Sequence, residues 1–178
     1  KKIKNNNIVF SVIICCYNSE KYLVETIESV ISQTFIKWEL VIINDGSTDK
    51  TKDIISKYKQ EGLPIIYHEQ PNSGYARSRN KALEIMNGEW AVFLDHDDIC
   101  YKNRLEEQFK DIKNNPNCNL FFSNADYITE DNIIFDNHYN FIHNPNELTL
   151  KNKVAKQLVS KGCFIGSSTV VINKNHFL

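Results

Sequence analysis

Long hydrophobic runs and an excess of positive charge are both missing from this sequence. Its longest apolar stretch, IVFSVIICCY at residues 8–17, is far shorter than the roughly 20 residues that a membrane-spanning helix needs. The formal net charge is -1, so no overall positive field indicates binding to nucleic acid. These absences predict a globular chain without a nucleic-acid partner.

Paired cysteine motifs and a signal sequence are missing as well. The cysteines are odd in number and none has a CxxC spacing, so they do not indicate a disulfide framework. We interpret them as small buried hydrophobic residues in a reducing compartment; they are Cys15, Cys16, Cys100, Cys118 and Cys163. The basic start KKIKNNN is followed by an apolar stretch too short for a signal peptide. We therefore expect a cytoplasmic location.

The chain has the composition of an ordinary globular domain, with 42% hydrophobic and 24% charged residues among 178. Four apolar stretches have the pattern of strands covered on both faces; they lie at 8–17, 38–44, 64–69 and 90–94. Segments with helical spacing follow them, at 18–35, 45–62, 76–87 and 104–114. This alternation predicts one α/β domain, a Rossmann-like three-layer α/β/α sandwich with a mostly parallel central sheet.

The rhythm changes after Asn119. We expect one strand within 120–128 and a second at 133–135, paired across the turn TEDN. Residues 136–149 are polar and predict a loop, and 150–162 have the spacing of a short helix. The apolar stretch SSTVVIN, at 167–173, predicts a last strand.

Polar and acidic residues follow the predicted strands, where ligands bind in open α/β sheets. Asp45 follows the second strand, and the run DHDD, residues 95–98, follows the fourth. Tyr17 and Asn18 follow the first strand, in a loop that lacks glycine. Because a dinucleotide site needs GxGxxG there and a P-loop needs GxxxxGK(S/T), the sequence predicts neither kind of site.

The acidic run at 95–98 has two interpretations. Carboxylates a few ångströms apart raise one another's pKa unless a cation joins them. Mg²⁺ or Mn²⁺ commonly takes one or two protein carboxylates and completes its shell with phosphate oxygens and water, which predicts a phosphate-bearing ligand. The alternative is that these aspartates cap the next helix and face water. Asp45 likewise fits either a turn residue or an acceptor for the ring N–H of uracil or thymine.

Three segments together resemble family 2 glycosyltransferases, an inverting group with the GT-A fold. Residues 11–51, from SVIICCYNSE to NDGSTDKT, are similar to the family's opening segment. NSGYARSRNKAL, at 72–83, resembles its N-x-G-x-x-x-A-R-N-x-G segment, and FLDHDD, at 93–98, resembles its DxD motif. The resemblance covers about residues 8–110 in the family's order. It identifies 1–178 as a single GT-A domain, truncated at the C-terminus.

The resemblance implies a pocket for a nucleoside-diphosphate sugar. Asp45 would accept a hydrogen bond from the uracil ring, and Tyr17 would stack on the base or flank it. Cys15, which stands where the family usually has proline, would line the base pocket, and Glu20 matches an acidic residue of the same pocket. Arg79 would support the donor site.

The resemblance also implies a metal at the DxD motif. Asp95 and Asp97 would hold the ribose and the ion, which is Mn²⁺ or Mg²⁺, and Asp98 would share the ion with Asp97. His96 fills the variable position, and we interpret it as a spectator, although an imidazole there could reach a phosphate or the ion.

The function implied is transfer of a sugar, with inversion, from a donor such as a UDP-sugar to the hydroxyl of a glycan or lipid-linked acceptor. The resemblance suggests synthesis of cell-surface polysaccharide or glycoconjugate. The family's catalytic base lies on a later helix, so we expect it beyond Leu178. Segments beyond that residue could also hold the protein at the inner face of the membrane.

Three other functions remain open. A non-catalytic nucleotide-sugar-binding module would keep the pocket without the reaction. A sugar-phosphate nucleotidyltransferase would share the sheet and a metal-binding aspartate, but it usually has a glycine-rich loop after the first strand. A phosphoacceptor domain needs acids after the first and third strands, where this chain has Tyr17-Asn18 and Gln70-Pro71.

Overall fold

The structure, a computed structural model, describes residues 8–131, 133–137 and 166–176. Six strands form a central sheet in the order β3-β2-β1-β4-β8-β5. The first four are parallel, whereas β8 is antiparallel to both of its neighbours. The strands are β1 (Phe10–Cys16), β2 (Trp38–Asp45), β3 (Ile65–Gln70), β4 (Trp90–Phe93), β5 (Leu120–Phe121) and β8 (Val171–Asn173). The predicted α/β class and mostly parallel sheet are confirmed.

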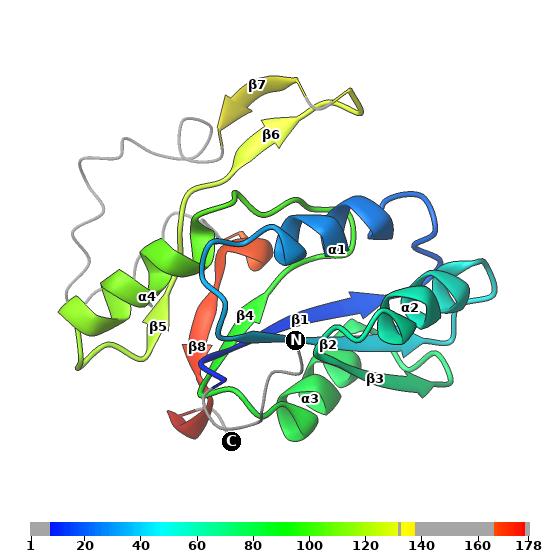
Figure 1. The fold of residues 1–178 in the computed structure, drawn as a ribbon, viewed down its shortest axis with the longest axis horizontal. Helices are drawn as coiled ribbons and strands as arrows, with labels where there is room; N and C mark the ends of the chain where they lie inside the picture. Colours follow the sequence, from blue (N-terminus) through cyan, green and yellow to red (C-terminus); the bar gives the residue numbers. More distant parts are fainter. Residues whose placement is uncertain (1–7, 132, 138–165, 177–178) are drawn as a thin grey trace, which may run out of the picture.

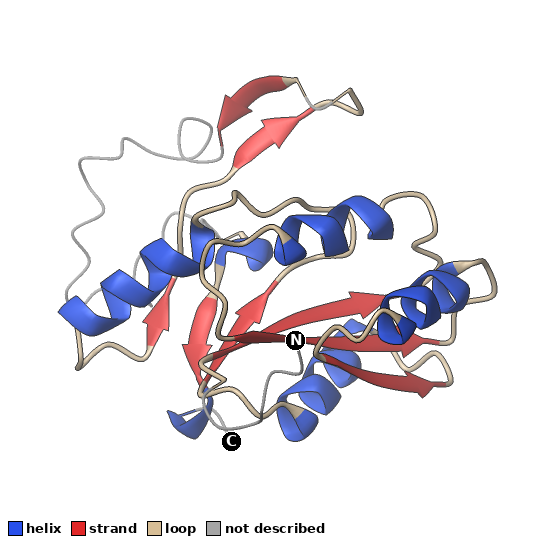
Figure 2. Cartoon of the chain, viewed as in Figure 1, coloured by secondary structure: helices blue, strands red, loops and turns tan. Residues whose placement is uncertain are grey.

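Helices cover both faces of this sheet (Figures 1 and 2). They are α1 (Leu23–Ile31), α2 (Thr51–Gln60), α3 (Tyr75–Ile85) and α4 (Arg104–Asn114). The helices α1, α2 and α4 pack on one face, in a core cluster that includes Val12 and Ile14. Helix α3 packs on the other face, in a cluster that includes Ile13 and Ala82. Neighbouring positions of β1 serve opposite cores, so the strand is apolar except at Ser11, whose hydroxyl donates to Glu39 Oε1 at 2.6 Å, and all of its residues are buried.

The register of the parallel strands brings their carboxyl ends to one edge of the sheet. Cys16, at the end of β1, pairs with Asn44 of β2, and Ile13 pairs with Phe93 at the end of β4. The residues that follow these ends therefore emerge side by side. No helix of the described residues is long and apolar enough to cross a membrane.

The prediction of a strand over 167–173 is only partly right. Val171–Asn173 form β8, but Ser167–Thr169 form a 3₁₀ helix, η2. The two serines of this turn are drawn to the end of β4, because the Ser168 hydroxyl accepts the Asp95 N–H at 2.8 Å and the Ser167 hydroxyl donates to the Asp95 carboxylate. With these bonds the backbone at Ser167–Thr169 forms a 3₁₀ turn in place of the extended conformation that the apolar pattern predicts.

The stretch 120–128 contains two strands rather than one. Ser123 and Asn124 interrupt it, so that β5 joins the central sheet and β6 (Asp126–Ile128) pairs with β7 (Ile134–Asn137) in a separate antiparallel hairpin. The hairpin lies beyond α1, away from the central sheet (Figure 1). The loop predicted at 136–149 is wrong at its start, since 136 and 137 belong to β7; the rest of it and the helix predicted at 150–162 lie outside the described residues.

Candidate functional site

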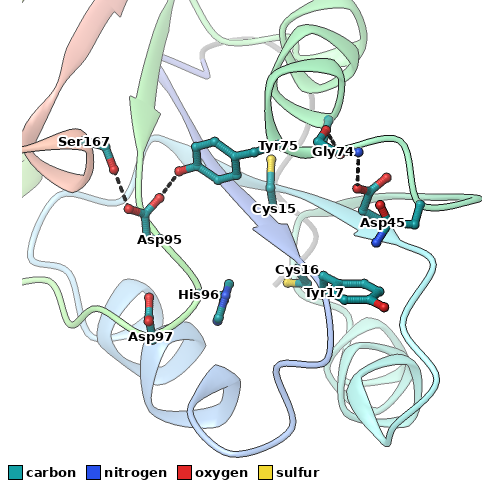
Figure 3. Close-up of a pocket in the computed structure, with 12 residues that line it drawn as sticks. Cys15, Cys16, Tyr17, Asp45, Gly74, Tyr75, Asp95, His96, Asp97 and Ser167 are labelled. Atoms are coloured by element: carbon teal, nitrogen blue, oxygen red, sulfur yellow. Dashed lines mark hydrogen bonds between the residues drawn. The ribbon is translucent and has the colours of Figure 1, made fainter.

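A pocket of about 380 Å³ lies at the carboxyl ends of β1, β2 and β4, closed by the start of α3 and by η2 (Figure 3). Carboxylates from separate strand ends, Asp45 after β2 and Asp95 and Asp97 after β4, line this one pocket. The full lining is Cys15, Cys16, Tyr17, Asp45, Asn72, Gly74, Tyr75, Ser78, Asp95, His96, Asp97 and Ser167. The volume is within the roughly 300–1,000 Å³ of pockets that enclose a small ligand.

Asp45 closes β2 and is almost fully buried, with 5% of its surface exposed. Its Oδ1 accepts hydrogen bonds from Gln70 Nε2 at 2.7 Å and from the Ser73 N–H at 2.9 Å. Its Oδ2 accepts from the Gly74 N–H at 2.8 Å. Burial alone would raise the pKa of Asp45, but these hydrogen bonds outweigh it and lower the pKa. Asp45 is therefore an ionised acceptor that also holds the loop before α3 against the end of β2.

Asp95 is bound on both oxygens by side chains from distant parts of the chain. Its Oδ1 accepts from the Tyr75 hydroxyl and from Arg79 Nη2, the latter at 3.1 Å, and its Oδ2 accepts from the Ser167 hydroxyl (Figure 3). The Arg79 guanidinium lies 4.0 Å from the Tyr75 ring centre and 4.6 Å from that of Phe93. Arg79 thus does not line the pocket but fixes two residues that do.

Asp97 and Asp98 have different surroundings from Asp95. Asp97 makes no hydrogen bond or ion pair with any described residue, and it points to solvent within the pocket. Partial burial of its carboxyl raises the pKa of Asp98, and the neighbouring charges of Asp97 and Asp95 add to the effect, against a hydrogen bond with Ser168. A divalent cation beside Asp97 and Asp98 would relieve this repulsion.

These two carboxylates fit Mn²⁺ or Mg²⁺. Across residues 8–131, 133–137 and 166–176, no three His, Cys, Asp or Glu side chains are grouped as a metal site. A site with one or two carboxylates is the kind that Mg²⁺ shares with substrate phosphates and water. His96, between the aspartates, has its Nδ1 buried without a partner in the described part of the chain, and its backbone oxygen accepts from Thr26 Oγ1 at 2.9 Å.

The loop after β1 carries Tyr17 and Glu20 to different places. Tyr17 lines the pocket with 49% of its surface exposed, and Cys15 lies beside it, where burial raises the pKa of the thiol to about 12. Glu20 is not among the lining residues. Its carboxylate accepts the Lys50 N–H at 3.0 Å, and its own N–H donates to Asp49 Oδ2 at 2.9 Å. In this structure Glu20 joins the loop to the start of α2 rather than facing the pocket.

Sequence reasoning gave no role in the site to several lining residues, among them Asn72, Tyr75, Ser78 and Ser167. The first three lie in the segment that resembles the family motif, so their place in that motif was a usable signal. Ser167 had none, because it reaches Asp95 from 72 positions away along the chain through the antiparallel insertion of β8.

Comparisons with known proteins agree with this geometry. The sequence profile of Glycosyl transferase family 2 matches residues 11–172. The chain is 36% identical over 166 residues to TuaG of Bacillus subtilis, a proposed teichuronic acid biosynthesis glycosyltransferase. This match covers 92% of the present chain and 62% of TuaG. It is 28% identical over 169 residues to WfgD of Escherichia coli, named a UDP-Glc:alpha-D-GlcNAc-diphosphoundecaprenol beta-1,3-glucosyltransferase, covering 95% of this chain and 62% of WfgD.

A solved structure has the same fold. The crystal structure of S. aureus TarS 1-349 in complex with UDP-GlcNAc superposes with a TM-score of 0.71 at 28% identity, over 93% of this chain and 45% of that one. The chain therefore spans 62% of the length of the two curated relatives above and less than half of the TarS chain.

Proposed function

The chain belongs to glycosyl transferase family 2, and on that premise we propose that it takes a sugar from a UDP-sugar and transfers it to an acceptor hydroxyl. The observation that carries the proposal is that Asp45 and the pair Asp95 and Asp97, from separate strand ends, line one pocket. The pocket thus has one end beside Tyr17 and Asp45 and another beside Asp95 and Asp97.

The uridine would occupy the end of the pocket beside β1 and β2. Asp45 is ionised and has one donor on Oδ2, so that oxygen can still accept from the ring N–H of uracil. The half-exposed Tyr17 ring would cover the base, and Cys15 would lie against it. TarS was solved with UDP and with UDP-GlcNAc, and WfgD is named for UDP-Glc, which favours uridine over other nucleosides.

The diphosphate would lie at the end of the pocket beside Asp95 and Asp97. Asp97 and Asp98 would hold a divalent ion, Mn²⁺ or Mg²⁺, and Asp95 would orient the ribose through the carboxylate that Tyr75 and Ser167 hold. When bound, the ion stabilises the negative charge that grows on the departing diphosphate. Without it, the negative charges of Asp97 and Asp98 would repel the phosphates.

The reaction proposed is a single displacement with inversion. The acceptor oxygen forms a bond to the anomeric carbon while the bond from that carbon to the diphosphate breaks, and a general base takes the hydroxyl proton. The products are the glycosylated acceptor and UDP. WfgD is named for a lipid-linked acceptor, alpha-D-GlcNAc-diphosphoundecaprenol, and TuaG is named for teichuronic acid biosynthesis. We therefore propose that the acceptor is a glycan or a lipid-linked sugar.

Calorimetric titration with UDP, with and without Mn²⁺, tests the proposal. We expect UDP to bind more tightly with Mn²⁺, and Asp97→Asn to remove most of that gain, while Asp111→Asn on the exposed side of α4 leaves it unchanged. The nucleotide product of sugar transfer from UDP-glucose to an acceptor should be UDP. Release of pyrophosphate instead would indicate a nucleotidyltransferase, and failure to bind UDP in the presence of Mn²⁺ would overturn the proposal.

A further inference from the structure

A second cavity, of about 230 Å³, lies between the start of α1 and the β6–β7 hairpin. Its lining includes Glu25 of α1 and Tyr22, the residue just before α1. The hairpin contributes Ile128 and Glu130, and the segment after β4 contributes Asp97 and Ile99. None of the family motifs includes this hairpin, which sequence reasoning treated only as a pair of strands.

The second cavity adjoins the donor pocket, because Asp97 lines both. A hydrogen bond of 2.9 Å from Thr26 Oγ1, on α1, to the backbone oxygen of His96 joins α1 to the segment that lines both cavities. The hairpin is held on the other side, where Glu130 Oε1 accepts from Lys21 Nζ at 2.7 Å and from the Tyr22 hydroxyl at 3.2 Å. A molecule in this cavity would lie next to the diphosphate end of the donor.

The polar lining of this cavity can accept hydrogen bonds but offers few. Neither Glu25 nor Asp97 has a hydrogen-bond or ion-pair partner among the described residues, and an ionised carboxylate is an acceptor only. Lys21, whose Nζ lies 4.6 Å from the centre of the Tyr22 ring, is paired with Glu130. If a metal ion neutralised Asp97, Glu25 would still face the cavity unpaired. The ligand must therefore supply donors, and an anionic ligand would be repelled.

The rest of the lining is apolar or aromatic. Ile99 and Ile128 are exposed by 42% and 38% of their surface, and the Tyr22 ring lies beside them in the lining. Hydroxyl donors on an otherwise apolar ring are the chemistry of a sugar, whose C–H faces pack on such side chains. The volume is below the roughly 300–1,000 Å³ of pockets for drug-sized ligands, so it suits one sugar ring rather than a chain of several.

We propose that this cavity is the subsite for the acceptor, and that it binds the terminal sugar of the acceptor when that sugar is uncharged. The inference rests on the proposed function, because it needs a donor in the adjoining pocket. The subsite binds and orients the acceptor hydroxyl next to Asp97. A phosphate or a uronic acid carboxylate at this position is disfavoured by Glu25.

A matched pair of glycosides tests the subsite. The ¹⁵N-labelled protein, saturated with UDP and diamagnetic Mg²⁺, is titrated with p-nitrophenyl β-D-glucopyranoside and, separately, with p-nitrophenyl β-D-glucuronide, which differs only in carrying a carboxylate. We expect the glucoside to shift the backbone amides of Tyr22, Glu25 and Ile128, and the glucuronide to bind at least about tenfold more weakly. Glu25→Gln should weaken the glucoside about tenfold, as for the loss of one charge-assisted hydrogen bond, and bring the two affinities closer.

The control is Glu84→Gln, the same change at an exposed ion pair on α3, which should leave both titrations unchanged. The subsite is refuted if UDP shifts the amides of Asp45 and Gly74 but the glucoside shifts none around the second cavity. It is also refuted if the glucuronide binds as tightly as the glucoside. If UDP itself shifts nothing in the first pocket, the proposed function fails, and the subsite falls with it.

Discussion

Replacing Asp45 by Asn should cost the protein stability as well as nucleotide affinity, and the structure gives the size of the first effect. Asn retains one carbonyl oxygen, which can keep the bonds from Gln70 and Ser73 on the Oδ1 side. Its NH₂ group then takes the place of Oδ2 and faces the Gly74 N–H. In the parent protein this N–H donates to Asp45 Oδ2 at 2.8 Å. Two donors cannot bond, so the Gly74 N–H is left without its partner.

A fully buried N–H left unsatisfied costs roughly 1–3 kcal/mol, and the bond from the Gly74 N–H is part-buried, so we expect Asp45→Asn to lower the free energy of unfolding by the lower part of that range, about 1 kcal/mol, at pH 7. For a chain of this length the melting temperature should fall by about 2–4 °C per kcal/mol. The assay is urea unfolding followed by circular dichroism, with Asp111→Asn as the control, because Asp111 lies exposed on α4.

The same variant predicts a pH dependence. The pKa of Asp45 is lower in the folded state than its ordinary value of about 3.9. Its contribution is therefore complete above that value and is lost as the pH falls toward the folded pKa. The stability difference between the parent and Asp45→Asn should be largest at neutral pH and shrink below about pH 3.9. Equal urea midpoints for the two proteins at pH 7 would show that the assigned bonds to Asp45 do not hold the loop.

Three further predictions concern other residues. Because burial raises the pKa of Cys15 to about 12, iodoacetamide at pH 8 should label exposed Cys118 long before Cys15, as read by mass spectrometry of the peptides; prompt labelling of Cys15 would contradict its burial. Gly46→Ala should destabilise the protein more than Gly62→Ala. Both glycines have positive φ, but only at Gly46 would a Cβ lie 2.7 Å from a backbone nitrogen. Thermal unfolding of the two variants measures this difference, and equal losses of stability would contradict it. The folded pKa of Asp98 is raised, so its ionisation opposes folding as the pH rises through the ordinary carboxyl range. Asp98→Asn should therefore raise the melting temperature of the metal-free protein at pH 7 and weaken the Mn²⁺-dependent part of UDP binding. A lower melting temperature of the metal-free variant would refute the repulsion.

The central sheet and the meeting of its acidic strand ends were predictable from the sequence. Continuous apolar stretches alternating with helical spacing leave few topologies, and a parallel sheet necessarily gathers its carboxyl ends at one edge. That is why Asp45 and Asp97 could be expected at the same edge of the sheet although 52 positions separate them in the sequence. The limits of β1 to β4 were predictable within two residues, whereas α1 and α2 begin five and six residues after the starts of the segments predicted for them.

The remainder depended on contacts between distant segments, which local patterns do not contain. The apolar stretch 167–173 indicated a strand, but nothing in it showed that the strand would run antiparallel or that Ser167 and Ser168 would turn toward Asp95. Glu20 matched a motif position, yet its side chain accepts the Lys50 N–H at the start of α2, a contact between segments 30 positions apart.

The insertion of β8 between β4 and β5 has a consequence for how the protein is made. The strands β1 to β4 come from consecutive βα units, whose contacts are short in sequence and can form early on the ribosome. Until Val171–Asn173 have been synthesised, however, β4 is an open edge with unpaired N–H and C=O groups, and Asp95 lacks the serines that steady it. A nascent chain that has not reached about residue 173 is thus prone to aggregate through this edge, so chaperone contact is most needed between the synthesis of β4 and that of β8.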